Sequence, residues 1–478
     1  MSLIVFWEYS TWGIIIQFAI LAAILLLANT LRRKIPFFRK SLLPTAVIGG
    51  FIALALKYTG IFDGIITTDF LDKVTYHTIA LGFIALGLKT AYGANKVKEK
   101  GGLAVSGARN GLIIVGGYVI QGIVGLAITY FLAATFMPDL FASAGLLLPM
   151  GFGQGPGQAN NYGTMYESQF GFVGGQSFGL SIASLGFVWA CIPGVIYMNM
   201  LRRKGKIPPV KEIPYQDSKD LEEMKGTGSE LPLVDACDKM TIQIGFVLLT
   251  FGLTFLFMWG FDKLLIDNGT LGNFGVNTVR PLIWGFNFIF GTLFAILVRK
   301  IMAWMRKKGV AKRDYISNFM MNRIAGVVFD FMIIASIMAI DISVLKSLWV
   351  PLLLVTTAGG FVTLFYLKFI AKRFYKGYEY PGFFVMYGTQ TGTASTGIAL
   401  LREVDPNFET PASQIVVSGS VGAMVFGFPL MLLMSLGPKQ PGLTLIILIV
   451  FFAVLMVGLN WRYIFKKRKP KVDAEKHE

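Results

Sequence analysis

The sequence has 478 residues, of which 54% are hydrophobic and only 15% are charged. Soluble domains carry about 25% charged residues, so this composition argues against an ordinary soluble protein. The net charge of +17 does not indicate a nucleic-acid partner. The lysines and arginines lie in short segments between apolar runs, a distribution that indicates which loops of a membrane protein face the cytoplasm.

Eleven apolar runs predict membrane-spanning helices, since a helix needs about 20 residues to cross a bilayer. We therefore expect an all-α polytopic membrane protein. The predicted spans lie near 11–31, 42–60, 74–92, 106–131, 172–200, 240–263, 281–300, 321–341, 347–371, 411–436 and 442–462. A charged segment with three prolines, 202–239, is expected to be a cytoplasmic linker.

Two further segments, about 144–167 and 381–402, contain too many glycines and polar residues for a continuous helix. Non-helical backbone at membrane depth is tolerated only when protein buries it or it lines a cavity. Each segment is therefore predicted to be a re-entrant hairpin. Their central stretches read Gly151-Phe152-Gly153-Gln154-Gly155-Pro156-Gly157-Gln158 and Gly388-Thr389-Gln390-Thr391-Gly392-Thr393-Ala394-Ser395.

The distribution of charge supports this topology. With the N-terminus outside and both hairpins re-entrant, the basic segments all fall on the cytoplasmic side, as the positive-inside rule requires. These segments are 32–40, 96–100, 202–206, 299–308, 372–376 and 466–469. The same topology predicts two inverted repeats, 1–201 and 240–437, each with five spans and one hairpin. Residues 438–478 add a helix and a basic cytoplasmic tail.

The hairpin apices are the predicted binding site, because broken helices in inverted repeats place substrate and ion near the membrane midplane. Helix amino ends favour a carboxylate. The residues expected to bind substrate are Gln154, Gly155, Gly157, Gln158, Asn160, Asn161, Gly388, Gln390, Gly392, Thr393 and Arg402. Hydroxyl and carboxylate oxygens suit Na⁺, and the residues expected to bind it are Thr389, Thr391, Ser395, Thr396 and Asp330.

Each of these assignments has a structural alternative. Glycines also let helices pack closely, and the threonines could satisfy local backbone. Asp330 lies within a predicted span, where carboxylates are costly and indicate function; it could instead pair with a neighbouring helix. Arg402 could reach a substrate carboxylate or pair with Glu403 or Asp405.

Two regions of the chain resemble the bacterial sodium/glutamate symporter family. One is 144–201, which contains the first break and then Ile192-Pro193-Gly194-Val195-Ile196-Tyr197. The other is 336–395, which runs from Ile337-Met338-Ala339-Ile340-Asp341-Ile342 through Gly377-Tyr378-Glu379 to the second break. The resemblance implies a homodimeric, Na⁺-coupled carrier of glutamate or a related anionic amino acid in the bacterial cytoplasmic membrane. It also implies a substrate-carrying domain, built on the hairpins, that moves against a dimer scaffold.

Other functions remain as alternatives. A Na⁺-coupled carrier of di- or tricarboxylates is the nearest, and an ion channel with re-entrant loops is an alternative of another class. An enzyme is not expected, because the two histidines, His77 and His477, lie far apart in the chain. Neither glycine-rich break carries the Lys-Ser/Thr ending of a phosphate loop. We expect no cofactor and no metal other than Na⁺.

Overall fold

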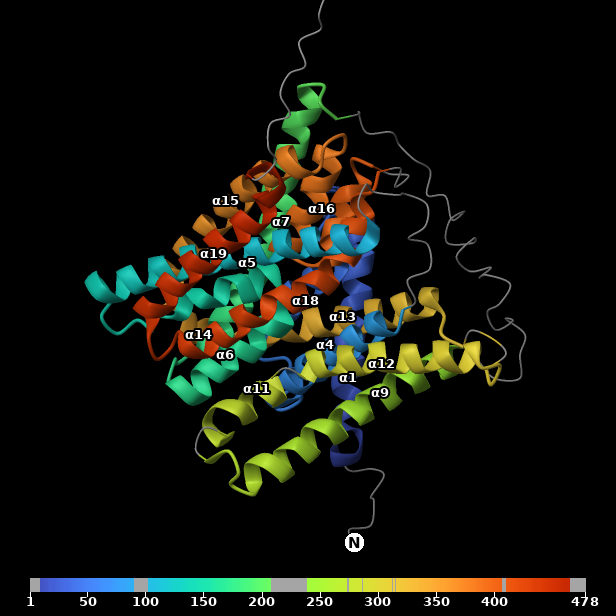
Figure 1. Ribbon diagram of the computed structural model, residues 1–478. Helices are drawn as coiled ribbons and strands as arrows, with labels where there is room; N and C mark the ends of the chain where they lie inside the picture. The colour runs from blue at the N-terminus through green and yellow to red at the C-terminus, as the bar shows by residue number, and fades with distance from the viewer. Residues whose placement is uncertain are drawn as a thin grey trace, which may run out of the picture.

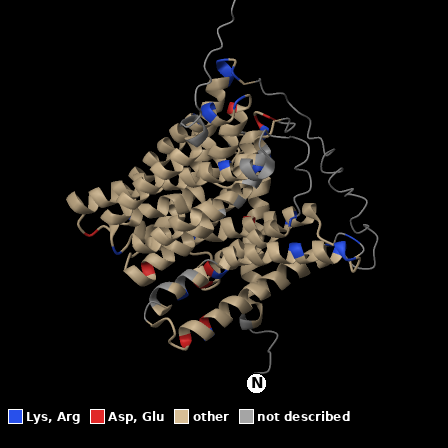
Figure 2. Cartoon of the chain, in the orientation of Figure 1, with Lys and Arg blue, Asp and Glu red and all other residues tan. Residues whose placement is uncertain are grey.

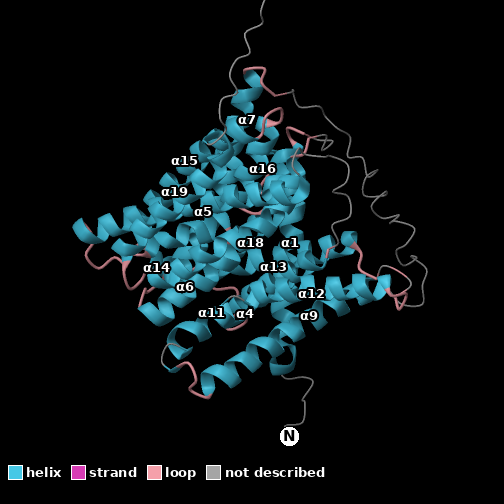
Figure 3. Ribbon diagram, in the orientation of Figure 1, coloured by secondary structure: helices cyan, strands magenta, loops and turns pink. Residues whose placement is uncertain are grey.

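A computed structural model describes residues 9–89, 102–207, 239–272, 275–285, 287–311, 313, 315–405 and 410–464. Within these residues all regular secondary structure is helical, as Figure 3 shows. This confirms the all-α class. Most of the expected linker, the basic tail and the basic segment 96–100 lie outside the described residues.

The helices of the first half of the chain follow the predicted order. They are α1 (Tyr9–Lys34), α2 (Pro36–Ser41), α3 (Thr45–Lys57), α4 (Thr68–Leu88), α5 (Gly102–Thr135), the short turns η1 (Ala144–Leu146) and η2 (Pro149–Gly153), α6 (Pro156–Phe170) and α7 (Gly175–Arg203). The helix α4 begins six residues before the expected start at 74, because the Thr67 hydroxyl accepts a hydrogen bond from the Phe70 N–H at 3.2 Å and caps it.

The second half of the chain contains a similar series. Its elements are α9 (Lys239–Phe261), η3 (Asp262–Asp267), η4 (Gly275–Val279), α11 (Arg280–Gly285), α12 (Asn287–Lys307), α13 (Asn318–Ala339), α14 (Ile342–Leu345), α15 (Trp349–Phe374), α16 (Glu379–Thr391), α17 (Ala394–Arg402), α18 (Ala412–Leu436) and α19 (Pro441–Ile464).

Eight helices in the described part of the chain are long and apolar enough to cross a membrane, against the eleven expected. They are α1, α5, α7, α9, α12, α13, α15 and α19. The other three expected spans are also helical. The helix α3 has only 13 residues, and α4 carries Asp69, Asp72 and Lys73 in its first two turns. The helix α18 has 25 residues, and several of its side chains lie outside the described part of the chain.

The helices form two packed groups, which Figure 1 shows in the upper and lower parts of the view. In one group α5 packs against α15, α18 and α19. In the other, α4 packs against α12 and α13, and α3 packs against α13 and α1. The helix α6 contacts α4 and α13 from the second group as well as α7. The charged residues lie mainly near helix ends, and the middles of the helices contain few of them (Figure 2).

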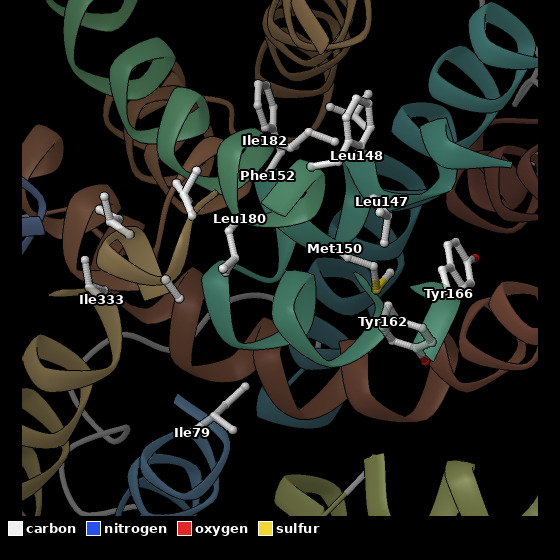
Figure 4. Packing of buried hydrophobic residues seen from close by; sticks show 14 of the residues in the cluster. Ile79, Leu147, Leu148, Met150, Phe152, Tyr162, Tyr166, Leu180, Ile182 and Ile333 are labelled. Carbon is white, nitrogen blue, oxygen red and sulfur yellow. The ribbon is translucent and has the colours of Figure 1, made fainter. Parts of the chain in front are cut away.

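The apolar arm of the first broken segment lies inside the protein. Leu147, Leu148, Met150 and Phe152 are completely buried, and Figure 4 shows them beside Ile182 of α7. Apolar side chains of α4 and α13 complete the same core cluster. Because helical packing encloses the arm, its irregular backbone is shielded from any surrounding hydrocarbon.

Candidate functional site at two facing helix breaks

The first break separates the wide helical turn η2 from α6. Gly155 connects them with φ 87° and ψ −177°, a conformation that is essentially restricted to glycine. Pro156 then begins α6, where its missing N–H costs nothing. The amino end of this 15-residue helix therefore points at the break, with its unpaired N–H groups and partial positive charge.

The second break separates α16 from α17 at Gly392 and Thr393. Thr393 is the N-cap of α17, and its hydroxyl accepts a hydrogen bond from the Thr396 N–H at 3.4 Å. The Thr393 and Thr396 hydroxyl oxygens lie 3.2 Å apart. The carboxyl end of α16 and the amino end of α17 therefore meet at this point. Helix carbonyls there suit a cation, and helix N–H groups suit an anion.

The two breaks face each other. A Cβ atom added to Gly155 would lie 3.7 Å from both the Gly392 carbonyl oxygen and the Thr393 Cγ2 atom. The glycines thus bring backbone from the two halves of the chain into near contact. The structure places three of the predicted residues, Gly155, Gly392 and Thr393, at one point.

Two flanking helices hold the breaks in place. Gln121 of α5 donates from Nε2 to the Gln390 carbonyl oxygen and to the Thr363 hydroxyl of α15, both at 2.9 Å. On α7, Gly186 lies directly against the Thr391 carbonyl oxygen and the Phe152 ring, so that both broken segments contact this one residue. The helix α5 also packs against η2, so α5 and α7 each contact both broken segments.

Two predicted glutamines carry buried amides that have no hydrogen-bond partner among the described residues. Gln158 is 1% exposed and Gln390 is 0% exposed, and neither the Oε1 nor the Nε2 atom of either residue is paired. The Gln390 side chain packs against Gly117 of α5. An unpaired buried polar group costs about 1–3 kcal/mol, so we expect an ordered water or a ligand to supply the partners of these two amides.

The predicted threonines are already used locally. The Thr389 hydroxyl donates to the Val385 carbonyl and the Thr391 hydroxyl to the Tyr387 carbonyl, both at 2.7 Å. Each hydroxyl oxygen still has a lone pair, so these bonds do not prevent cation binding. Gly388 crosses the backbone of Gly397 at close range and lets the two arms of the second broken segment pack. The side chain of Ser395 lies outside the described residues.

Two other predicted residues are hydrogen-bonded to groups outside the two breaks. Asn160 accepts a hydrogen bond from Gln176 at 2.9 Å, and Asn161 donates to the Gly285 carbonyl at 3.0 Å. Asp330 is exposed on α13, and Arg402 is exposed at the last residue of α17. Both residues therefore stay predictions of the sequence.

Two acidic residues, Glu403 and Asp405, follow Arg402 closely in the chain and accept hydrogen bonds. Glu403 accepts hydrogen bonds from Arg202 through both its carbonyl, at 2.7 Å, and its carboxylate, at 3.3 Å. Asp405 accepts hydrogen bonds from the Thr410 N–H at 3.0 Å and from the Thr410 hydroxyl at 2.5 Å.

Sequence reasoning missed Gln121, Thr363 and Gly186. The first two are buried polar residues inside the apolar runs of α5 and α15. The rule that singled out Asp330, a polar group within a predicted span, applies equally to Gln121 and could have found it. No signal in the sequence distinguishes Gly186 from the many other glycines in spans.

No protein-family model, curated protein or solved structure matches this chain. The resemblance to the sodium/glutamate symporters is therefore an expectation drawn from the sequence motifs. Among the described residues, no group of three or more His, Cys, Asp or Glu side chains could hold a metal ion. The oxygens at the facing breaks are helix carbonyls and hydroxyls, which are ligands for a hard monovalent cation.

Proposed function

We propose that this chain is a secondary transporter that couples Na⁺ to the symport of glutamate or a related small anionic amino acid. The observation that carries the proposal is the meeting of two helix breaks at Gly155 and Gly392, close in the chain to two buried glutamine amides that have no partner in the described part of the protein. Helix amino ends would bind the substrate carboxylate and helix carbonyls would bind Na⁺. A di- or tricarboxylate would use the same groups.

The packing of the helices supports an inverted repeat. When α1, α3, α4, α5 and α7 are matched in order with α9, α12, α13, α15 and α18, the contacts match as well. The helix α1 packs on α3 as α9 packs on α12, and α3 packs on α13 as α12 packs on α4. The helix α7 packs on α15 as α18 packs on α5. Each series has its break between its last two helices, and α19 has no counterpart.

The charge layout supports the proposed orientation, with the N-terminus outside and the C-terminus in the cytoplasm. Arg202 and Arg203 at the end of α7 and Lys372 and Arg373 at the end of α15 are on the side that the repeat assigns to the cytoplasm. Figure 2 shows most of the basic residues along one margin of the molecule. The homodimer and the bacterial cytoplasmic membrane are proposed from the family resemblance.

The test is uptake by purified protein in liposomes at constant pH, with radiolabelled glutamate and a panel of amino acids and di- and tricarboxylates. An inward Na⁺ gradient should drive saturable uptake, and replacing Na⁺ with choline should abolish it. Counter-exchange would identify a carrier, whereas ohmic current would identify a channel. Uptake that persists in choline and collapses with the proton gradient would refute Na⁺ coupling, and uptake of only neutral or cationic solutes would refute the substrate class.

A further inference from the structure

A small pocket lies far from the breaks, where α7 and α15 end and α16 begins. Its volume is about 170 Å³, roughly ten times the ~10–15 Å³ that one water needs. Figure 1 shows these three helices close together at the top of the view. The proposed function does not use this pocket.

The pocket wall carries four lysines, Lys204, Lys206, Lys368 and Lys372, and one acidic residue, Glu379. Lysines often lie at helix carboxyl ends, where they offset the helix dipole. That effect accounts for Lys204 and Lys372. It does not account for Lys206, which lies three residues beyond the end of α7, or for Lys368, which lies six residues before the end of α15. Four cations gathered against one carboxylate leave an excess of positive charge that an anion would neutralise.

The rest of the wall is apolar and aromatic. It includes Met200, Phe383 and Tyr380, and the Lys368 ammonium lies 5.9 Å from the centre of the Tyr197 ring. Met200 is 41% exposed and its neighbour on the same helix, Ile196, is 63% exposed. The pocket therefore joins an apolar outer surface of α7. Tyrosine beside lysine at the end of a spanning helix is typical of the membrane–water interface.

We propose that this pocket binds the phosphate headgroup of an anionic phospholipid. A lipid headgroup and a free phosphate ion would both be held by the lysine ammonium groups, as in basic pockets between spanning helices at the cytoplasmic face. The lipid is favoured over a free phosphate because the apolar wall and the exposed side chains of α7 would contact glycerol and acyl chains. Inorganic phosphate offers nothing for those groups to contact.

The experiment is native mass spectrometry of the full chain in detergent, titrated with phosphatidylglycerol or with phosphatidylcholine of the same acyl chains. The test variant carries Lys204→Gln and Lys372→Gln. The control carries Lys307→Gln and Lys308→Gln, which remove the same charge from exposed positions at the end of α12. At about 1 kcal/mol per lysine, the test variant should bind phosphatidylglycerol about thirtyfold more weakly. The control should bind as the unmodified protein does, and phosphatidylcholine should bind weakly to all three.

Three outcomes would overturn the proposal. Equal weakening in both variants would mean that general surface charge attracts the lipid. Equal affinity for the two lipids would mean that the phosphate–lysine contact contributes nothing. Displacement of the lipid by inorganic phosphate, together with stabilisation of the protein by phosphate alone, would assign the pocket to a free anion. Unchanged thermal unfolding of both variants confirms that any loss of binding is not a loss of fold.

Discussion

Replacing Gln390 with methionine separates the binding and structural roles of a buried amide. The two side chains have similar lengths, and such volume-conserving exchanges usually cost less than about 1.5 kcal/mol in packing. The Gln390 amide is fully buried and unpaired, and such a group costs about 1–3 kcal/mol. Gln390→Met should therefore leave the ligand-free protein as stable as before, or more stable by up to about 3 kcal/mol.

The same variant should bind its substrate poorly. A hydrogen bond from an amide to a charged group contributes about 1.5–3 kcal/mol, so the apparent affinity should fall roughly 10- to 150-fold. The assays are thermal unfolding without ligand, and Na⁺-driven uptake at varied substrate concentration. Gln158→Met should behave in the same way, because the Gln158 amide is also buried and unpaired.

Gln121→Met is the matched comparison. It removes two hydrogen bonds of 2.9 Å and leaves a buried hydroxyl and carbonyl with one partner fewer, so it should lower the thermal midpoint. If Gln390→Met lowers the midpoint as Gln121→Met does, the Gln390 amide is structural. If Gln390→Met leaves the apparent affinity unchanged, the residue does not bind substrate, and the reasoning from its unpaired amide is refuted.

Three further predictions concern the breaks, the cation site and the topology. Gly155→Ala should lower the stability of the protein by about 1–3 kcal/mol through backbone strain at the break, and it should abolish uptake. Gly171→Ala is the control, because Gly171 has a φ of 72° with open space around it at the other end of α6, and this variant should retain uptake. Equal loss of uptake in both variants would indicate global destabilisation. Asp330→Asn should reduce the apparent Na⁺ affinity of uptake if the carboxylate contributes to coupling, and an unchanged Na⁺ dependence would remove Asp330 from the cation site. Cysteines placed at Met165 and Tyr380 should react with impermeant reagents from opposite sides of the membrane, and labelling of both from one side would refute the inverted repeat.

The helical class and the positions of the breaks could be predicted from the sequence, because long apolar runs and clusters of glycine are local signals. The break at Gly392 falls where the glycine and polar residues interrupt the apolar pattern. Helix boundaries were less predictable. The start of α4 depends on a cap at Thr67, and the charged residues of its first turns lie within the helix rather than before it.

The residues that complete the site could be predicted only in part, because their roles depend on contacts between distant segments. Gln121 meets Gln390 across 269 positions of the chain, and nothing near either residue encodes that contact. Asn160 and Asn161 follow the first break closely in sequence, yet the turn of α6 directs them to Gln176 and to the Gly285 carbonyl. Because a helix rotates successive side chains away from each other, neighbours in sequence contact different elements.

The contact between Gly155 and Gly392 also bears on the synthesis of the protein. The two glycines are 237 positions apart (392 − 155), so at about 5–20 residues per second the second arrives roughly 12–47 s after the first. Through that interval the first broken segment has α5 and α7 beside it but lacks the opposing backbone and its contacts with α13 and α16. Exposed backbone is not stable in hydrocarbon. We therefore expect the nascent first half to keep this segment in water or against a chaperone until the second half is made.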